Sequence, residues 1–262
     1  MERTGRREQI VQIVVPSHKR WSTLSTPYAI DNCLVCIPES QLENYADEHP
    51  DIEFVTHPDS IKGISAKRQW IYEKFKNVYM ADDDILYIKR NYTANGLGVH
   101  PDMDTMLTPE EAYHAVQHLA GIAIDAGIKM FGFNHAGNPK YYKPQEPFSL
   151  NKVIVGASLG LLWDSRLHFP LEDAGATCDD HYITLLNAYY NRINLVDNRY
   201  SMAYIPVETN TGGLGGIRTV EAEKNAYHFL REKFGKAVQR KRPKVSSGAY
   251  SHEWERVLDI PL

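Results

Sequence analysis

The sequence has no long run of apolar residues. Its longest near-apolar segment, VIVGASLGLLW at 153–163, has 11 residues, whereas a membrane-spanning helix needs about 20. The opening MERTGRREQ is polar and charged, and the apolar stretch of a signal peptide does not follow it. We therefore expect a protein without membrane contacts, located in the cytoplasm.

Cysteine is scarce, with three residues in 262. Cys33 and Cys36 form a CxxC, which in isolation suggests a redox or zinc half-site. Their segment NCLVCIP is typical of a buried strand, however, and residues three apart in a strand face opposite sides of the sheet. Cys178 supplies no second CxxC. We therefore expect buried structural thiols and no zinc site.

The glycine motifs that bind nucleotide phosphates are absent too. The glycine-rich stretch TNTGGLGGIRT, which contains Gly212–Gly216, matches neither GxGxxG nor the GK[ST] ending of a Walker loop. It therefore indicates no dinucleotide or ATP site. A surface loop and a lid that closes over a ligand both stay open as interpretations.

Charge is unevenly distributed along the chain. The formal net charge is −4, yet residues 231–244 hold seven Lys/Arg and one Glu, which gives this segment +6 and the remainder −10. A solvated helix and tail would explain such a basic segment. Contact with the phosphates of a polyanion would explain it equally well.

Strand and helix patterns alternate regularly in the first half of the chain. Four β-rich segments are expected as strands, at 9–16, 32–38, 52–57 and 77–81. Helices are expected at 39–49 and 65–75, the second with Ser65 as its cap. This alternation predicts one α/β domain, in which a mixed, mostly parallel sheet is flanked by helices.

The second half is less regular. Thr108 and Glu111 form a capping box, with Pro109 at the first position of a helix that runs to about Ala126. Further strands are expected at 129–134, 152–163 and 199–206. Further helices are expected at 177–191 and 220–234, with Gly235 as the stop of the last one.

Three consecutive aspartates, Asp82, Asp83 and Asp84, follow the strand at 77–81. Ligands of open α/β sheets bind at the carboxyl ends of the strands. In an extended chain Asp82 and Asp84 would share one side and Asp83 would face the other. Two such carboxylates are suited to a divalent cation that holds a diphosphate. A solvated acidic turn is the alternative.

A second acidic pair, Asp179 and Asp180, opens the helix expected at 177–191. A hydroxyl that acts as a nucleophile needs a base beside it, and a carboxylate can serve. One aspartate could cap the helix while the other projects into a site. A capping aspartate with a surface neighbour is the purely structural alternative.

The chain resembles nucleotide-sugar-dependent glycosyltransferases of the GT-A fold. The resemblance rests on IVVPSHKR at the first strand, GISAKRQW before VYMADDDI, and CDDHYITLLNAYYN further on. It implies a divalent metal, Mn²⁺ or Mg²⁺, and a nucleotide-sugar donor, expected to be a UDP-sugar. The family often has Arg-Asn where this chain has Lys67 and Arg68.

The resemblance implies a role for each matching residue. The catalytic residues would be Asp180 as the base and Asp179 as its assistant, in an inverting reaction. The metal ligands would be Asp82 and Asp84. The nucleotide-sugar would be bound by Pro16, Ser17, Arg20, Lys67, Arg68, Asp82 and Asp83.

A narrower resemblance is to phage glycosyltransferases that modify DNA, the TET-associated group. The compact length, the GGLGGIRT loop and the basic C-terminal segment carry it. It implies a DNA acceptor, the hydroxymethyl group of 5-hydroxymethylcytosine or a related pyrimidine, in the cytoplasm of a phage host. The residues expected to contact DNA phosphates are Lys236, Arg240, Lys241, Arg242 and Lys244.

Three other functions stay open: a glycosyltransferase with a polysaccharide or other acceptor, a sugar nucleotidyltransferase, and a nucleic-acid-binding module without activity. A nucleotidyltransferase normally has a glycine-rich loop after its first strand, and PSHKRWST has no glycine. A binding module would leave both acidic clusters unused. Within one domain of 1–262, we expect a donor half at 1–90, an acceptor half at 91–210, and a glycine-rich loop with the basic segment at 211–262.

Overall fold

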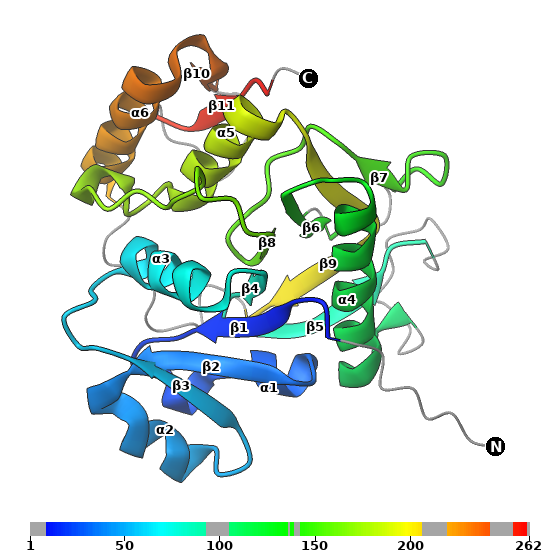
Figure 1. The fold of residues 1–262 in the computed structure, drawn as a ribbon, viewed down its shortest axis with the longest axis vertical. Coiled ribbons are helices and arrows are strands. Elements are labelled where there is room, and N and C mark those ends of the chain that lie inside the picture. Colours follow the sequence, from blue (N-terminus) through cyan, green and yellow to red (C-terminus); the bar gives the residue numbers. More distant parts are fainter. Residues whose placement is uncertain are drawn as a thin grey trace.

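A computed structural model describes residues 9–92, 105–135, 137–138, 142–205, 219–241 and 254–260. Its central feature is a sheet of nine strands with helices on both faces (Figure 1). This is the mixed α/β fold expected from the alternation of strand and helix patterns. Among the residues described, no helix combines the length and the hydropathy that a membrane span requires.

The elements follow in chain order. The strands are β1 (Gln12–Pro16), β2 (Cys33–Pro38), β3 (Glu53–His57), β4 (Val78–Ala81), β5 (Ile85–Arg90), β6 (Met130–Asn134), β7 (Phe148–Ser149), β8 (Ser158–Leu161), β9 (Asn194–Tyr204), β10 (Val238–Arg240) and β11 (Arg256–Leu258). The α-helices are α1 (Thr26–Ala29), α2 (Leu42–Glu48), α3 (Ile64–Phe75), α4 (Pro109–Asp125), α5 (Asp179–Asn191) and α6 (Val220–Phe234). The 3₁₀ turns are η1 (Trp21–Thr23), η2 (Glu39–Gln41), η5 (Asp173–Gly175) and η7 (Gly235–Ala237).

The strand order of the large sheet is β3-β2-β1-β4-β8-β6-β9-β5, with β7 paired to β9. The first four strands of this order are mutually parallel, and β6 is parallel to β9, whereas β8, β5 and β7 pair in the antiparallel direction. Because β1 and β4 are parallel neighbours, with Val14 opposite Met80, their carboxyl ends lie at the same edge. The segments that follow Pro16 and Ala81 are therefore brought together.

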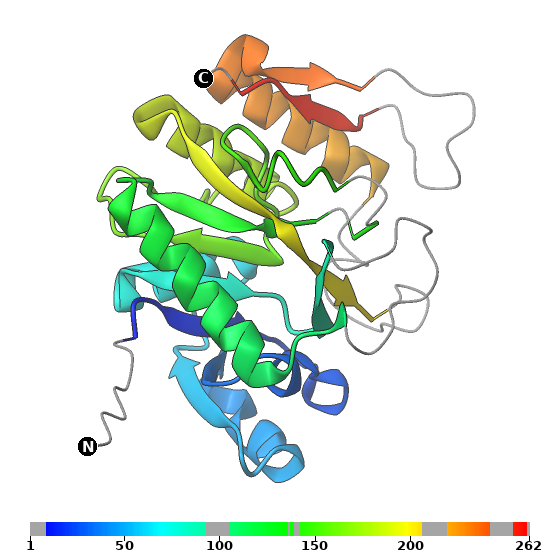
Figure 2. The same ribbon diagram turned by 90° about the vertical axis from the view of Figure 1, so that its right-hand side faces the viewer.

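Each face of the sheet has its own hydrophobic core. Helix α4 crosses one face (Figure 2), where Val116 and Leu119 lie among the buried residues of the first core cluster. Helices α3, α5 and α6 supply buried residues of the second cluster, including Ile71. Cys33 belongs to the first cluster and Cys36 to the second, so the expectation that the two thiols face opposite sides is confirmed. Burial raises the pKa of Cys36 and of Cys178 to about 12.

Several element boundaries differ from those expected. Helix α3 begins at Ile64 behind Gly63, whose φ of 82° suits glycine, so Ser65 is not the cap. The strand expected at 152–163 is limited to β8, and the one expected at 199–206 begins earlier, at Asn194. The capping box of Thr108 and Glu111 is present as expected.

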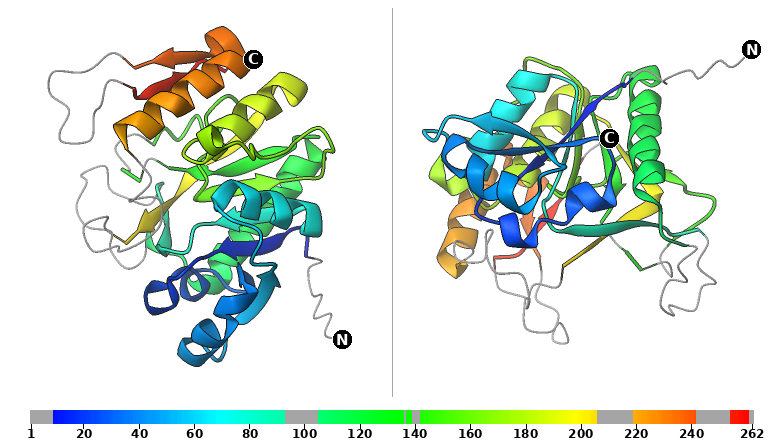
Figure 3. Two further views of the ribbon diagram at one scale, coloured as in Figure 1. Left: turned by 90° about the vertical axis from the view of Figure 1, so that its left-hand side faces the viewer. Right: turned by 90° about the horizontal axis from the view of Figure 1, so that it is seen from below.

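Strand β5 and the β10–β11 hairpin are among the elements that were not anticipated from the sequence. Strand β5 directly follows the three aspartates and pairs with β9 in the antiparallel direction. Strands β10 and β11 form a separate hairpin beside α6 (Figure 3), and β10 lies within the basic segment at 231–244. Helix α6 ends at Phe234 with Gly235 as its C-cap, as expected.

Candidate active site

Ser17 and Asp83 meet where β1 and β4 end. The Ser17 hydroxyl donates to Asp83 Oδ2 at 2.5 Å and lies 2.7 Å from the Tyr45 hydroxyl. The backbone N–H of Arg20 donates to the same Tyr45 oxygen at 3.0 Å. Because Ser17 has one proton and donates it to Asp83, the hydroxyl of Tyr45 must donate to Ser17. A directed chain of hydrogen bonds thus fixes the loop after β1.

The Arg20 guanidinium lies between Asp83 and Asp84. Its Nη1 is 2.9 Å from Asp83 Oδ1 and 3.2 Å from Asp84 Oδ2. The alternation of an extended chain, with Asp82 and Asp84 on one side and Asp83 on the other, was therefore wrong here. Strand β4 ends at Ala81 and the chain turns at Asp83 and Asp84, so both carboxylates reach one guanidinium. Burial raises the pKa of Asp83, with Arg20 and Ser17 opposing the shift.

Arg68 connects the two acidic clusters. Its Nη2 is 2.9 Å from Asp82 Oδ1 and its Nη1 is 2.6 Å from Asp179 Oδ2, and the Arg68 side chain is 5% exposed. The aspartates after β4 and the aspartates that open α5 therefore lie on opposite sides of one buried guanidinium. Burial raises the pKa of Asp82 to about 6, against the attraction of Arg68.

Asp179 and Asp180 have different surroundings. Asp179 is buried against Arg68, and burial raises its pKa. Asp180 is less buried, and its Oδ2 and Oδ1 accept from the backbone N–H groups of Gly156 (3.3 Å) and His181 (2.7 Å). Against the effect of burial, Arg68 and the two backbone N–H donors lower the pKa of Asp180. Asp180 is therefore the more exposed carboxylate of the pair, and its surroundings favour the ionised form.

Lys67 and Arg68 lie inside the protein rather than on its surface. The Lys67 ammonium donates to the backbone carbonyl of Ser17, and burial lowers its pKa to about 8. Pro16 is the buried last residue of β1. The residues expected to bind the donor thus surround the ends of β1 and β4, with Lys67 and Arg68 as buried supports.

The site has an excess of negative charge. Its five carboxylates, Asp82, Asp83, Asp84, Asp179 and Asp180, face three cationic side chains, those of Arg20, Lys67 and Arg68. No group of three or more metal-binding side chains is present among the residues that the structure describes. Asp82 and Asp84 keep 39% and 19% of their side chains exposed. Carboxylate oxygens of this kind, completed by substrate or water oxygens, fit Mg²⁺ or Mn²⁺.

Four residues of the site were not identified from the sequence: Tyr45, Gly156, His181 and Arg256. Arg256 Nε donates to His181 Nδ1 at 3.3 Å, although the two residues are 75 positions apart. Gly156 carries no chemistry of its own, and it was assigned to a strand that does not form there. Of the four, only His181 could have been identified from the sequence, because it follows Asp180 in the motif DDH.

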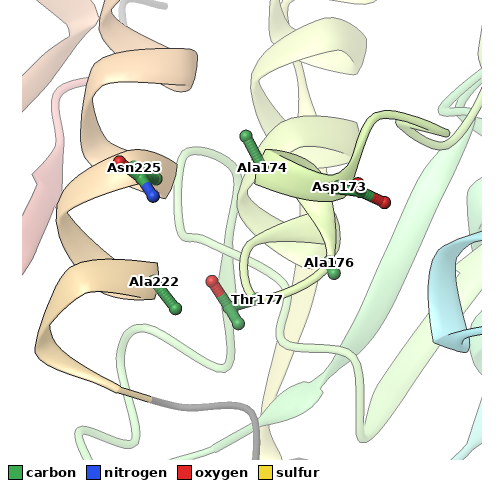
Figure 4. Close-up of a pocket in the computed structure, with 6 residues that line it drawn as sticks. All are labelled: Asp173, Ala174, Ala176, Thr177, Ala222 and Asn225. Carbon is green, nitrogen blue, oxygen red and sulfur yellow. The ribbon is translucent and has the colours of Figure 1, made fainter.

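A cavity of about 340 Å³ lies between η5 and α6 (Figure 4). It is lined by Asp173, Ala174, Ala176, Thr177, Ala222 and Asn225. None of the site residues expected from the sequence lines it. Thr177, however, is two positions before Asp179, so the cavity adjoins the start of α5.

The residues expected to contact DNA are only partly described. Lys236, Arg240 and Lys241 are exposed on η7, on β10 and just after it. Arg240 lies 4.4 Å from the Trp254 ring centroid, and Lys241 Nζ is 2.6 Å from Glu255 Oε2. Arg242, Lys244 and the loop Gly212–Gly216 lie outside the described residues.

Comparison with known proteins gives one family. The family model described as TAGT, TET-Associated Glycosyltransferase, matches residues 11–180. This range includes every donor, metal and catalytic residue expected above. No curated protein sequence matches the chain.

Two solved structures are similar in shape. The crystal structure of S. aureus TarS 1-349 has 12% identity and a TM-score of 0.46, over 87% of this chain and 72% of that chain. The structure of CMP:2-keto-3-deoxy-manno-octonic acid synthetase complexed with CTP has 9% identity and a TM-score of 0.38, over 72% of this chain and 88% of that one. Because both scores are below 0.5, neither structure informs the roles of individual residues.

Proposed function

The chain belongs to the family of TET-associated glycosyltransferases and is a glycosyltransferase, and from this premise we propose which residues transfer the sugar. The observation that carries the proposal is the position of Arg68 between Asp82 and Asp179. A transferase must bring its donor diphosphate and its base to the same sugar carbon. Arg68 holds the donor-side acids and the base-side acids in one rigid unit.

The nucleotide-sugar donor, a UDP-sugar in this proposal, binds at the ends of β1 and β4. Pro16, Ser17 and Arg20 form the wall on the β1 side, and Asp82 and Asp83 form the wall on the β4 side. Lys67 donates to the Ser17 carbonyl and Arg68 donates to Asp82, so these two buried side chains hold the walls in place. The directed hydrogen bonds from Arg20 through Tyr45 and Ser17 to Asp83 hold the loop after β1 in place before the donor binds, which lowers the cost of ordering the site.

A divalent cation, Mn²⁺ or Mg²⁺, would be held by Asp82 and Asp84. When bound, it supplies positive charge that stabilises the departing diphosphate. The excess of carboxylates over cationic side chains in this part of the chain supports the assignment. Arg20 keeps Asp84 in place, because its guanidinium lies 3.2 Å from Asp84 Oδ2.

Asp180 is the general base in this proposal. The acceptor hydroxyl oxygen forms a bond to the anomeric carbon while the bond from that carbon to the diphosphate oxygen breaks. The electron pair of the broken bond leaves with the diphosphate, and the hydroxyl proton goes to Asp180. Attack from the side opposite the leaving group inverts the configuration. Asp179 assists indirectly, because it holds Arg68 in place.

The acceptor in this proposal is the hydroxymethyl group of 5-hydroxymethylcytosine in DNA. Lys236, Arg240 and Lys241, with Arg242 and Lys244 beyond the described residues, would contact phosphates. Such contacts position a duplex without reading its sequence. The exposed Lys236, Arg240 and Lys241 support this reading.

The test is transfer itself. The protein is incubated with Mn²⁺ or Mg²⁺, a panel of nucleotide sugars, and DNA that contains 5-hydroxymethylcytosine. The DNA is then digested to nucleosides for mass spectrometry. A nucleoside heavier by one sugar residue supports the proposal. Transfer to a free sugar or polysaccharide, with none to DNA, would retain the glycosyltransferase and reject the DNA acceptor.

A further inference from the structure

A buried arginine from the C-terminal hairpin reaches the start of α5. Arg256 lies on β11, and its side chain is 6% exposed. Its Nη1 is 2.8 Å from Glu223 Oε2, and its Nη2 donates to the Thr177 carbonyl at 3.4 Å. Its Nε donates to His181 Nδ1 at 3.3 Å. One guanidinium thus joins β11, the first turn of α6 and the residues around the acidic pair.

The contact with Arg256 determines which ring nitrogen of His181 carries the proton. An arginine N–H can only donate, so Nδ1 of His181 must accept and must be unprotonated. The neutral ring therefore carries its proton on Nε2, which lies on the side of the ring away from Arg256. Within the described residues, Nε2 has no hydrogen-bond partner of its own.

The position of His181 in the chain places it beside the base. It follows Asp180 directly, and its backbone N–H donates to Asp180 Oδ1 at 2.7 Å. Asp180 also accepts from Gly156, so its carboxylate is fixed in direction. His181 supplies a neutral Nε2–H donor and Asp180 a fixed carboxylate acceptor from consecutive positions of the chain. A donor and an acceptor of this kind can hold one hydroxyl group, through its oxygen and its proton respectively.

We propose that His181 contacts the substrate, donating a hydrogen bond from Nε2 to the acceptor hydroxyl oxygen while Asp180 accepts the proton of that hydroxyl, and that Arg256 is the residue that positions His181. This inference rests on the proposed function, because it takes Asp180 as the base. The two hydrogen bonds direct a remaining lone pair of the hydroxyl oxygen toward the sugar carbon. Orientation of this kind is a large part of enzymatic rate enhancement.

The charges around His181 contribute to whether the pKa of its ring is raised or lowered. Burial lowers its pKa, Asp180 raises it, Arg256 lowers it, and Glu223 and Asp179 raise it, with a net lowering. The neutral ring is therefore the form present at neutral pH. Removal of the Arg256 charge leaves Asp179, Asp180 and Glu223 facing the ring, so the pKa must rise. Removal of the Glu223 charge should lower the pKa of His181.

The first experiment observes the ring directly. The full chain is labelled with ¹⁵N-histidine, and the His181 signals are assigned by comparison with His181→Gln. We expect the Nε2–H tautomer and a protonation midpoint below the ordinary value of about 6.5. The midpoint is expected to rise in Arg256→Gln and to fall in Glu223→Gln. An Nδ1–H tautomer, or a midpoint unchanged in both folded variants, would overturn the inference.

Arg231→Gln is the matched control. Arg231 also ties the hairpin to α6, since its Nη1 donates to the Val238 carbonyl at 2.6 Å, but it has no contact with His181. The His181 midpoint should stay where it is in Arg231→Gln. If Arg256→Gln fails to fold, Glu223→Gln alone tests the sign of the shift.

The second experiment measures transfer. His181→Phe keeps an aromatic ring but has no donor, so we expect kcat to fall on the order of 100-fold through lost orientation. His181→Gln retains an N–H and should recover part of that loss, and KM for the donor should change in neither variant. The acid limb of the pH profile should move to higher pH in Arg256→Gln. Equal activity of His181→Phe and wild type would reject substrate contact. Unchanged turnover in Asp180→Asn would instead reject the proposed base and leave the tautomer result standing.

Discussion

Gly156 lies so close to Arg68 that a Cβ on it would stand 2.4 Å from both terminal nitrogens of the guanidinium. Atoms do not approach this closely without displacement of one of them. Since Arg68 is held by Asp82 and Asp179, a side chain at position 156 must push the guanidinium away from both. Gly156 is therefore required because a buried cation occupies the space of its side chain.

Gly156→Ala should accordingly destabilise the protein and abolish most of its activity. A buried ion pair that loses its partner costs about 3–5 kcal/mol, and Asp82 and Asp179 would both be affected. Urea denaturation and a transfer assay measure the two effects. Gly121→Ala is the control, because its Cβ would meet only the flexible end of Ile10 at 3.3 Å and alanine favours a helix. Equal stability of the two variants would contradict the role given to Arg68.

Asp82→Ala and Asp84→Ala test the metal ligands. Each should lower metal-dependent transfer by at least about 100-fold, because loss of the charge stabilisation that a cation provides removes several kcal/mol. Titration of the apoprotein with Mn²⁺ by calorimetry should show weakened binding in both. Asp47→Ala removes an exposed carboxylate on α2 and should change neither quantity. Near-normal turnover and Mn²⁺ affinity in both variants would reject the assignment.

Asp180→Asn tests the base. The substitution keeps the shape of the side chain and removes its ability to accept a proton. Turnover should fall roughly 100-fold or more, the usual range for general-base catalysis, with donor affinity nearly unchanged. Asp179→Asn should act differently, through lost stability, since it weakens the contact with Arg68. If Asp179→Asn is folded and is the more damaging to turnover, the roles of the two aspartates are reversed.

The free energy of unfolding should depend on pH through Lys67, and the sign of this dependence follows from its pKa. Burial lowers its pKa to about 8, whereas in the unfolded chain it is about 10.4. Between these values the unfolded chain binds more protons, so the free energy of unfolding must rise with pH. The contribution is on the order of 1–3 kcal/mol between pH 8 and 10. Denaturation of wild type and Lys67→Met across this range measures it, and the difference between the two curves should grow in favour of wild type. Parallel curves would contradict a buried, titrating ammonium.

The sequence predicted the parts of the site that depend on strand ends. A buried β-rich segment followed by aspartates places carboxylates at the edge of a parallel sheet, and Asp82 to Asp84 lie there. The direction of each carboxylate was not predictable, because it depends on the turn after Ala81 and on Arg20, which lies 63 residues before Asp83. The same limit applied to Arg256, whose contact with His181 exists only once β11 has packed beside α5 and α6.

The C-terminal segment shows that amino-acid composition alone does not predict short paired strands. Its seven basic residues predicted a helix and tail or a polyanion contact, and both interpretations missed the β10–β11 hairpin. A three-residue strand such as Val238–Arg240 is too short for hydrophobic periodicity to reveal. Pairing with β11, which lies 16 or more residues further on, is a tertiary event.

The last prediction concerns the DNA acceptor. If Lys236, Arg240 and Lys241 contact phosphates, neutralising all three to Gln should weaken DNA binding. Each contact with a phosphate releases a counterion, so the plot of log affinity against log salt should flatten by roughly one unit per lost contact. Donor affinity should not change, because the proposed donor site is at the ends of β1 and β4, on other elements of the fold.

The control for that triple variant neutralises basic residues outside the hairpin. Lys62 and Lys129 lie on loops before α3 and β6, and their double variant should leave the salt slope as it is in wild type. The hydroxymethyl group projects into the major groove of a duplex, so binding can be measured on double-stranded DNA without base extrusion. Equal slopes for the triple variant and wild type would show that Lys236, Arg240 and Lys241 do not contact DNA phosphates. In that case the acidic site would still define a glycosyltransferase, and its acceptor would have to be sought among molecules that carry no phosphate backbone.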